Sequence, residues 1–527
     1  PASPVKRWEV APSSLVARGE PPLQRIDLTV ESGETLRACE LRVWSGERLL
    51  AEKELGELVK GTNAVSVLLK EPETPVPTRW VLSDGRRTLA EQVLTWNPPR
   101  HWTLYVLKSA HVDIGLHDSQ YKQRLMGVDF IDQARRLADE TAGWSEASRY
   151  RYVVEGLWWW LNYPRDRSER LAGEIARDYV KAGIFDIGAS HSGNHTQVYG
   201  MEELCRSAYY LRELRSRWDV PGETMLMVDN NGITWPLVTA YADAGIKNLA
   251  FLPNAWNPTT VGGTRIDVGW DSKLPHLFYW YGPDGKSRLL VWANPHYIST
   301  GDHFGIGTCR KQSWSVPPPE TIAPQMAKQL ALLESRYPYD VWLVSNYDDN
   351  ETPNLRFPAL AKTWNARWRW PELRTVGDLS EPFREVEKRF GDRISTLRGD
   401  ITGGWAQHPL STPPLLARKR AADRLLPVAE TLATLARLVD PDFVYPSVAF
   451  RRAWDALVCN DEHGYGTSYY KGRPVYDTWM QKRDWIDRGL ATAQTESARA
   501  LTTLAALAAS EGPSVFVFNP TLHPRCE

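Results

Sequence analysis

The fold is set by a stretch that reads Trp102-Thr103-Leu104-Tyr105-Val106-Leu107 and is followed closely by His111-Val112-Asp113. A short apolar run of this kind is typical of a buried strand. Side chains alternate along an extended chain, so His111 and Asp113 point the same way where the strand ends. An imidazole beside a carboxylate can hold a divalent metal, although the same pair also forms an ordinary hydrogen bond.

Strands and helices alternate along the central part of the sequence, residues 101–405. Apolar runs predict strands at 102–109, 151–155, 184–188, 224–228, 247–252, 288–293 and 340–345. Helices are predicted between them at 119–142, 166–183, 200–217, 235–245 and 320–336. The alternation is typical of a distorted (β/α) barrel or a largely parallel sheet, whose active sites form at the carboxyl ends of the strands. Candidates at such ends are His111, Asp113, Glu155, Asp229 and residues 346–350.

The regions on either side of this part have different patterns. Residues 1–98 contain short alternating strands and predict an N-terminal β-sandwich that ends at the Pro98-Pro99 linker. Residues 412–509 repeat apolar side chains at helical spacing and predict a three-helix bundle. Residues 513–527 begin with an apolar segment that predicts the first strand of an incomplete C-terminal β domain. The sequence therefore predicts a multidomain α/β protein.

The composition argues against several classes of partner. The chain of 527 residues has 63 Lys and Arg against 64 Asp and Glu, so no single-sign charge favours nucleic acid. No apolar run approaches the roughly 20 residues that span a bilayer. The 5 cysteines are scattered and fit neither a disulfide scaffold nor a thiolate zinc site. The 24 tryptophans favour a carbohydrate ligand modestly, because indole faces stack on sugar rings, although most must pack in the core.

The sequence does not determine the cellular compartment of the protein. The chain begins at Pro1 rather than Met, which fits a secreted or periplasmic protein whose export signal has been removed. A trimmed cytoplasmic chain fits the same observation. The sequence also gives no indication of the oligomeric state.

Asp229 and two more residues lie at positions where metal ligands and catalytic groups are often found. Asp229 follows an apolar strand and precedes the sharp turn Asn230-Asn231-Gly232, although alone it could equally cap the next helix. Asp400 follows Gly399 in a segment that could also be a plain turn. His463 comes just after a helix, where a histidine often interacts with the helix dipole.

Taken together and in this order, these segments resemble glycoside hydrolase family 38, the retaining metal-dependent α-mannosidases, and most closely a divergent bacterial branch. The resemblance runs from about residue 103 to the end of the chain. No single piece is diagnostic, but their order and spacing make chance agreement unlikely. The matching pieces are Ser109–Gly115, the turn at Asp229, Phe278–Gly285, Gly399-Asp400, Glu462-His463 and Val517–Pro520.

The resemblance implies a zinc-dependent exo-α-glycosidase that acts on an oligosaccharide or glycoside. One zinc ion would be held by His111, Asp113, Asp229 and His463, a nitrogen and oxygen set that suits this metal. Asp229 would also be the nucleophile that forms a covalent glycosyl intermediate. Asp400 would be the general acid and then the base, with a pKa raised by burial or by the nearby carboxylate. Trp405 would form a wall of the sugar pocket.

The sequence departs from the better-known family members at two of these segments. Those proteins carry Asp-Pro-Phe-Gly-His at the nucleophile, whereas this chain has Asn230-Asn231-Gly232 after Asp229. They carry His-His-Asp-Ala near the last ligand, whereas this chain has Asp461-Glu462-His463-Gly464. The first change keeps the carboxylate but alters the pocket beside it.

Other polar residues are candidates for substrate binding. Asp349 and Asn350 belong to an acidic turn that could bind sugar hydroxyls, supply a rival general acid or form a solvated loop. Glu155 could bind a hydroxyl or be a buried, paired carboxylate. His195 could line the pocket. Two other functions also fit these residues: a metal-dependent carbohydrate deacetylase or amidohydrolase, and a carbohydrate-binding protein without catalysis.

Overall fold

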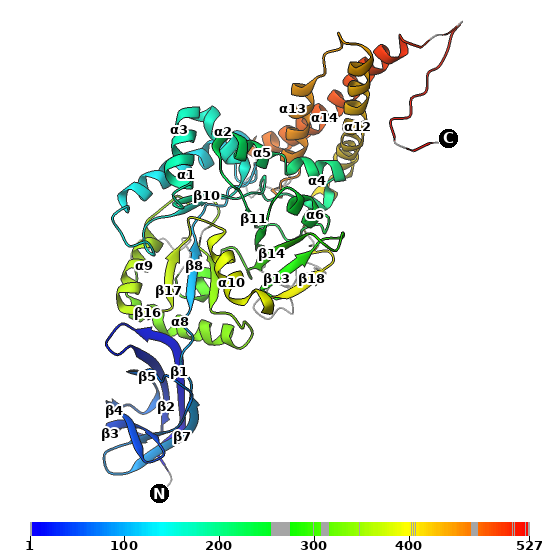
Figure 1. Ribbon diagram of the computed structural model, residues 1–527. Coiled ribbons are helices and arrows are strands. Elements are labelled where there is room, and N and C mark those ends of the chain that lie inside the picture. The colour runs from blue at the N-terminus through cyan, green and yellow to red at the C-terminus, as the bar shows by residue number, and fades with distance from the viewer. Residues whose placement is uncertain are drawn as a thin grey trace.

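The computed structural model describes a mixed α/β protein with several β-sheets, as the sequence predicts (Figure 1). The described residues are 3–254, 275–298, 300–306, 316–346, 348–401, 403, 405, 407–464, 473–508, 510, 512–521 and 523–524. None of the helices within these ranges is long and apolar enough to cross a membrane.

Two antiparallel sheets form the N-terminal part of the chain, at the blue end of Figure 1. The first has the order β16-β1-β2-β5, with β1 (Val5–Ala17), β2 (Leu23–Ser32), β5 (Gly61–Lys70) and β16 (Trp368–Trp370). The second has the order β4-β3-β6-β7, with β3 (Leu36–Ser45), β4 (Arg48–Leu58), β6 (Val76–Ser83) and β7 (Thr88–Trp96). Alternate residues of both sheets, such as Ile26 and Leu41, share one core. Strand β16 comes from the central part and ties that part to the first sheet.

The central strands form three further sheets that lie next to one another. They have the orders β10-β9, β11-β12-β14-β13-β18 and β15-β8-β17. Their bounds are β8 (Thr103–Leu107), β9 (Tyr152–Val154), β10 (Phe185–Ile187), β11 (Thr224–Val228), β12 (Asn248–Leu252), β13 (Leu277–Tyr281), β14 (Arg288–Ala293), β15 (Val341–Ser345), β17 (Glu372–Thr375) and β18 (Ser395–Arg398). All pairings are parallel except that of β13 with β14. A single closed barrel stays a prediction, because the ladders of the described residues join the strands only within these sheets.

One hydrophobic core connects the three central sheets. Leu104, Val153, Leu226 and Val344 come from β8, β9, β11 and β15, and all are buried in it. Alternate residues of β9 and β11, such as Met225, pack on the other side under the helices. The carboxyl ends of β8, β11 and β15 therefore open toward one region of the molecule, where the candidate residues follow.

Helices surround the central strands (Figure 1). The longer ones are α1 (Gln120–Glu140), α2 (Leu157–Asp166), α5 (Tyr210–Trp218), α8 (Pro319–Glu334), α9 (Arg356–Arg367) and α10 (Glu381–Phe390). The shorter ones are α3 (Glu169–Ile175), α4 (Met201–Ser207), α6 (Leu237–Asp243), α7 (Thr300–His303) and α11 (Gln407–Leu410), with the single turns η1 (Ala176–Val180), η2 (Thr196–Val198) and η3 (Gly391–Arg393). The predicted helices at 119–142, 200–217, 235–245 and 320–336 correspond to α1, α4 with α5, α6 and α8.

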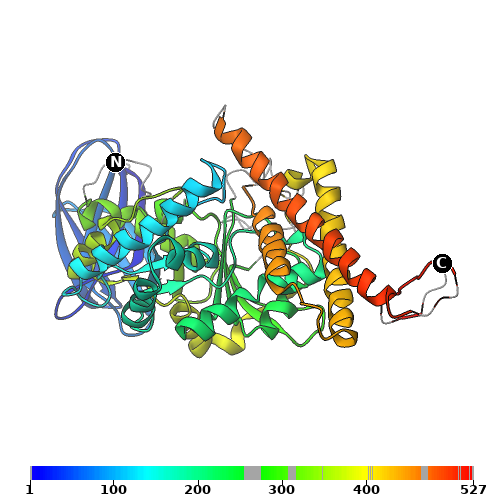
Figure 2. The same ribbon diagram turned by 90° about the horizontal axis from the view of Figure 1, so that it is seen from above.

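Three helices follow the central part: α12 (Pro413–Val439), α13 (Ser447–Asn460) and α14 (Arg473–Ala505). They share a small core that includes Leu426, Phe450 and Ala493. In Figure 2, α14 runs along the length of this unit. The divisions of the chain near residues 98–101 and 405–412 remain our proposal.

The chain after these helices differs from the sequence-based expectation. Residues 513–521 form no strand, and Val515 and Val517 are 90% and 92% exposed. A strand needs a neighbour for its backbone hydrogen bonds, and no other described segment pairs with this one. The apolar pattern therefore does not produce a strand within this chain, and the β domain stays a prediction.

Candidate metal centre and active site

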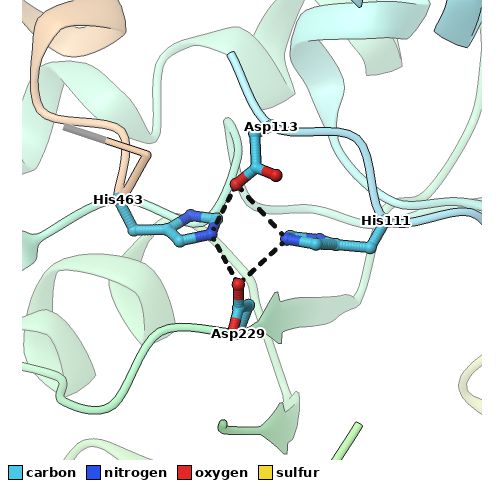
Figure 3. Close-up of side chains that lie close together, drawn as sticks. All are labelled: His111, Asp113, Asp229 and His463. Carbon is cyan, nitrogen blue, oxygen red and sulfur yellow. Dashed lines mark hydrogen bonds and ion pairs between the residues drawn. The ribbon is translucent and has the colours of Figure 1, made fainter. Parts of the chain in front are cut away.

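Four side chains from distant parts of the sequence meet in one buried cluster (Figure 3). They are His111 and Asp113 after β8, Asp229 after β11 and His463 after α13, and one ligand atom of each lies within 4.8 Å of the others. The His111 Nε2 atom is 3.5 Å from Asp113 Oδ1 and 3.4 Å from Asp229 Oδ2. The His463 Nε2 atom is 2.9 Å and 3.2 Å from the same two oxygens.

These distances and charges fit a single divalent cation. Four ligands arranged tetrahedrally about 2.0–2.1 Å from zinc would lie roughly 3.3 Å from one another, close to the observed separations. Two buried carboxylates need two positive charges, which a divalent ion supplies. The His111 Nε2 atom, both Asp113 oxygens and Asp229 Oδ1 have no hydrogen-bond partner among the described residues. The four residues named from the sequence thus form a set that could hold the metal.

A carboxylate orients each of the two imidazoles. Both carboxylate oxygens of Glu155 lie 3.0 Å from His111 Nδ1. In the same way, His463 Nδ1 is 2.8 Å from Glu462 Oε1 and 2.9 Å from the Gly193 carbonyl oxygen. An Nδ1–H that donates to such a partner leaves Nε2 as the lone pair that faces the cluster. Of the two alternatives for Glu155, a sugar-binding group and a buried, paired carboxylate, the geometry fits the second, because Glu155 is buried against His111.

The cluster also controls the protonation of its members. Burial lowers the pKa of His111, but Glu155 and Asp113 outweigh burial and hold the pKa well above its usual value. Burial raises the pKa of Asp229, yet the close approach of the His111 and His463 imidazoles outweighs it and keeps the pKa below its usual value. Asp229 is therefore an ionised carboxylate despite being buried.

The backbone places Asp229 in an uncommon conformation. Its φ is +59°, a left-handed value that costs most residues energy and that Asp tolerates better than others. The Asp229 amide donates to Leu252 O at 2.9 Å, and the Asn230 amide donates to Val228 O at 2.7 Å. The turn thus lifts the carboxylate from the end of β11 into the cluster.

His463 reaches the cluster by packing against the loop that follows β10. The His463 amide donates to Gly193 O at 2.8 Å. A Cβ at Gly193 would lie 2.7 Å from His463 Nδ1 and 3.0 Å from Val228 O. Only glycine allows so close an approach, and nothing in the sequence around Gly193 indicated this role.

We expect Gly193→Ala to weaken zinc binding by about 10–100-fold, because the added methyl group must push the His463 ring out of place. Competition with a coloured chelator measures the change. Gly173→Ala is the matched control, since a Cβ there meets nothing within 4 Å. Equal zinc affinity in the two variants would mean that the close contact does not position His463.

Asp400 is placed differently from the expectation. It is exposed, and its Oδ1 accepts a hydrogen bond of 2.8 Å from the Trp235 amide. The Ile233 amide donates to Ile401 O at 2.7 Å, so the two turns lie side by side. The Asp400 carboxylate thereby links the turn that follows Asp229 to the turn at residues 399–401. The expected burial of the Asp400 carboxyl group is not found. The sequence could not indicate this, because the exposure depends on the packing of distant segments.

A second carboxylate lies beside the cluster instead. Asp349 Oδ1 accepts a hydrogen bond of 2.5 Å from the Tyr297 hydroxyl, and Asp349 Oδ2 is 3.8 Å from His117 Nε2. The same His117 nitrogen is 3.3 Å from Asp113 Oδ2. The Tyr297 ring meets the His111 ring edge-on, with the centroids 5.2 Å apart. Asp349 therefore contacts His117 and Tyr297, which in turn contact the proposed metal ligands. The Asp349 side chain is 22% exposed.

The remaining predicted pocket residues occupy three different positions. The Asn350 amide donates to His111 O at 2.7 Å, and Asn350 Oδ1 has no hydrogen-bond partner among the described residues. The Trp405 ring stacks on the His463 ring, with the centroids 6.1 Å apart. His195 is fully buried near His408 rather than open to a ligand, and burial lowers its pKa well below the usual value. Trp405 and Asn350 therefore remain candidates for the pocket wall, and His195 is a buried neighbour of His408.

Solved structures with the same fold come from glycosidases. An α-mannosidase from Enterococcus faecalis V583 has 16% identity and a TM-score of 0.59, over 77% of this chain and 43% of that chain. A glycosyl hydrolase family 38 protein from Enterococcus faecalis has 15% identity and a TM-score of 0.51, over 77% of this chain and 40% of that chain. No protein-family model and no curated protein sequence matches.

This chain therefore has the fold of the α-mannosidases of glycoside hydrolase family 38, and the resemblance inferred from the sequence is confirmed at the level of the fold. It spans less than half the length of these two relatives.

Proposed function

We propose that this chain contains the active site of a retaining, zinc-dependent exo-α-glycosidase of the α-mannosidase type. The observation that supports this most is the buried set of His111, Asp113, Asp229 and His463, in which one carboxylate faces both imidazoles. The fold shared with the two solved structures supports a carbohydrate as the substrate. A zinc ion in this set would bind sugar hydroxyls and so help to distort the sugar ring toward the transition state.

The two oxygens of Asp229 support a double role for this residue. Oδ2 faces His111 and His463, whereas Oδ1 has no hydrogen-bond partner among the described residues. In the first step, Oδ1 forms a bond to the anomeric carbon while the bond from that carbon to the leaving oxygen breaks. In the second step, water attacks the same carbon, and the sugar leaves Asp229 with its original anomeric configuration.

The first step also requires a proton for the leaving oxygen, and two residues are candidates. The sequence pointed to Asp400, but its exposure and its hydrogen bond to the Trp235 amide support a role in fastening the turn. The partly exposed carboxylate of Asp349, held by the Tyr297 hydroxyl beside the ligand set, supports assigning the acid to Asp349. We therefore propose Asp349 as the general acid and then the base, with Asp400 as the alternative.

The proposed function is tested with a panel of aryl α-glycosides, with aryl α-mannoside first. We expect turnover by the zinc-loaded chain and, by proton NMR, release of the α anomer before any β anomer accumulates. Release of the β anomer first would contradict the retaining mechanism. Hydrolysis of acetylated sugars with no cleavage of glycosides would point to a deacetylase instead, and binding without turnover to a carbohydrate-binding protein.

The two acid candidates are distinguished by leaving groups of different basicity. We expect Asp349→Asn to lower kcat by about 10²–10⁴-fold on a poor leaving group and far less on dinitrophenolate, which needs no proton. Azide should restore turnover by forming a glycosyl azide, since a small anion can attack the anomeric carbon of the glycosyl intermediate and displace the Asp229 carboxylate. Asp400→Asn is the matched control and should keep the leaving-group dependence of the native chain. The opposite pattern would assign the acid to Asp400.

A further inference from the structure

The segment that supplies His463, residues 458–463, is bound along its length to the loop at residues 193–198. The His195 amide donates to Asp461 O at 2.7 Å, and the Asn194 side-chain amide donates to Val458 O at 2.7 Å. Asn194 and Glu462 also form an antiparallel β-bridge. These contacts join the end of α13 and the residues after it to a loop and not to a sheet, so the position of His463 depends on the groups that hold the two segments together.

Lys419 of α12 contacts both segments from within the protein. Its ammonium group is 2.7 Å from Asp461 Oδ2 and donates to Val198 O at 3.0 Å. It also pairs with Glu203 of α4. The Lys419 side chain is 1% exposed. Burial lowers its pKa, but Asp461 and Glu203 outweigh burial and keep the ammonium group charged.

Lys482 of α14 holds the same segment from another helix. Its ammonium group donates to Asn460 O at 2.9 Å and to Glu462 O at 3.3 Å, and it lies 4.0 Å from Glu462 Oε2. The other oxygen of Glu462, Oε1, is 2.8 Å from His463 Nδ1. The Lys482 side chain is fully buried. A chain of contacts thus runs from the ammonium group to the imidazole.

Packing of the three helices does not by itself explain where these two lysines lie. Burying an ammonium group is costly unless it is paired, and α12, α13 and α14 already share an apolar core. Both ammonium groups bind the few residues that lead into His463. Another ion pair, Arg206 with Glu430 at 2.6 Å, joins α4 to α12 without touching residues 458–463.

We infer that Lys419 and Lys482 are positioning residues for the fourth ligand of the proposed metal centre, so that α12 and α14 hold His463 in place for the metal. The inference rests on the metal site of the proposed function. It assigns to the three-helix unit a part in metal binding, in addition to its part in the fold.

The test uses the full chain with Lys419→Met and Lys482→Met, and Glu430→Gln as the matched control. Zinc affinity is measured by chelator competition, and hydrogen exchange of the His195 and His463 amides is measured in the metal-free protein. We expect each lysine variant to bind zinc about 10–100-fold more weakly and to exchange these amides faster. Glu430→Gln should match the native chain in both measurements, and Lys419→Arg should recover part of the affinity.

The outcomes separate this inference from the proposed function. Native zinc affinity and native amide exchange in both lysine variants would overturn the inference and leave the metal centre standing. If the native chain binds no zinc, the proposed metal centre fails, while the amide exchange still decides whether the lysines hold the segment. Should the lysine variants not fold, Asp461→Asn removes the carboxylate partner of Lys419 with little change in volume, and the same two measurements then decide.

Discussion

Replacement of Asp229 by Asn is expected to lower kcat on aryl α-mannosides by roughly 10⁴–10⁶-fold, the loss usual when a nucleophile is removed. The reason is that Asp229 Oδ1 forms the covalent bond to the sugar, and an amide oxygen is a far weaker nucleophile. The same change removes one negative charge from the cluster, where Asp229 Oδ2 lies 3.4 Å from His111 Nε2 and 3.2 Å from His463 Nε2. Steady-state kinetics at saturating zinc, with zinc content measured in parallel, separates the two effects.

A fluorinated substrate provides the control for this prediction. A 5-fluoro or 2-deoxy-2-fluoro glycosyl fluoride slows the second step, so the native chain should accumulate a sugar on Asp229 that mass spectrometry can locate. The Asp229→Asn variant should remain unlabelled. Turnover of the native chain with no labelled peptide would count against the covalent step and would favour an enzyme in which metal-bound water attacks directly.

Removal of the metal is expected to abolish turnover, with full recovery when zinc is returned. A second variant sharpens the test: His463→Ala keeps three of the four proposed ligands and should need a much higher zinc concentration for any recovery. Zinc affinity should rise with pH, because the pKa values of His111 and His463 lie well above their usual range in the metal-free protein and both imidazoles must lose protons to bind metal.

The control for this prediction is His101→Ala, since His101 is half-exposed beside Glu71 and Trp370, away from the cluster. It should bind zinc and turn over substrate as the native chain does. Unchanged activity of the native chain after complete chelation would remove the metal from the proposed function. Loss of activity in the control would instead point to a general effect of losing a histidine.

The clustering of His111, Asp113, Asp229 and His463 could be predicted from the sequence because most of these residues have a local signal. His111, Asp113 and Asp229 each follow an apolar run, and parallel strands bring such ends together whatever the exact topology. The strands β8, β11, β12, β14 and β15 were placed correctly for the same reason. Strands β13, β16, β17 and β18 were not predicted, and their length is not the reason, since β9 and β10 have only 3 residues each and were predicted.

What the sequence did not reveal are roles defined by contact across the chain. The sequence shows neither that Glu155 is buried against His111 nor that Asp400 is exposed and accepts a hydrogen bond from the Trp235 amide. Lys419 lies between Arg418 and Arg420, and Lys482 lies between Gln481 and Arg483, so neither lysine stands out from its neighbours in the sequence. Their burial depends on carboxylates and carbonyls from other parts of the chain, which no local pattern encodes.

The origin of the proposed fourth ligand has a consequence for how the protein is made. His463 emerges from the ribosome long after His111, so a nascent chain presents only part of the proposed ligand set until His463 has been made. A cation met in that period would be held loosely and exchanged readily. Tight capture waits for α13 and α14 to fold, which means that metal loading would serve as a late checkpoint on maturation rather than as a seed for it.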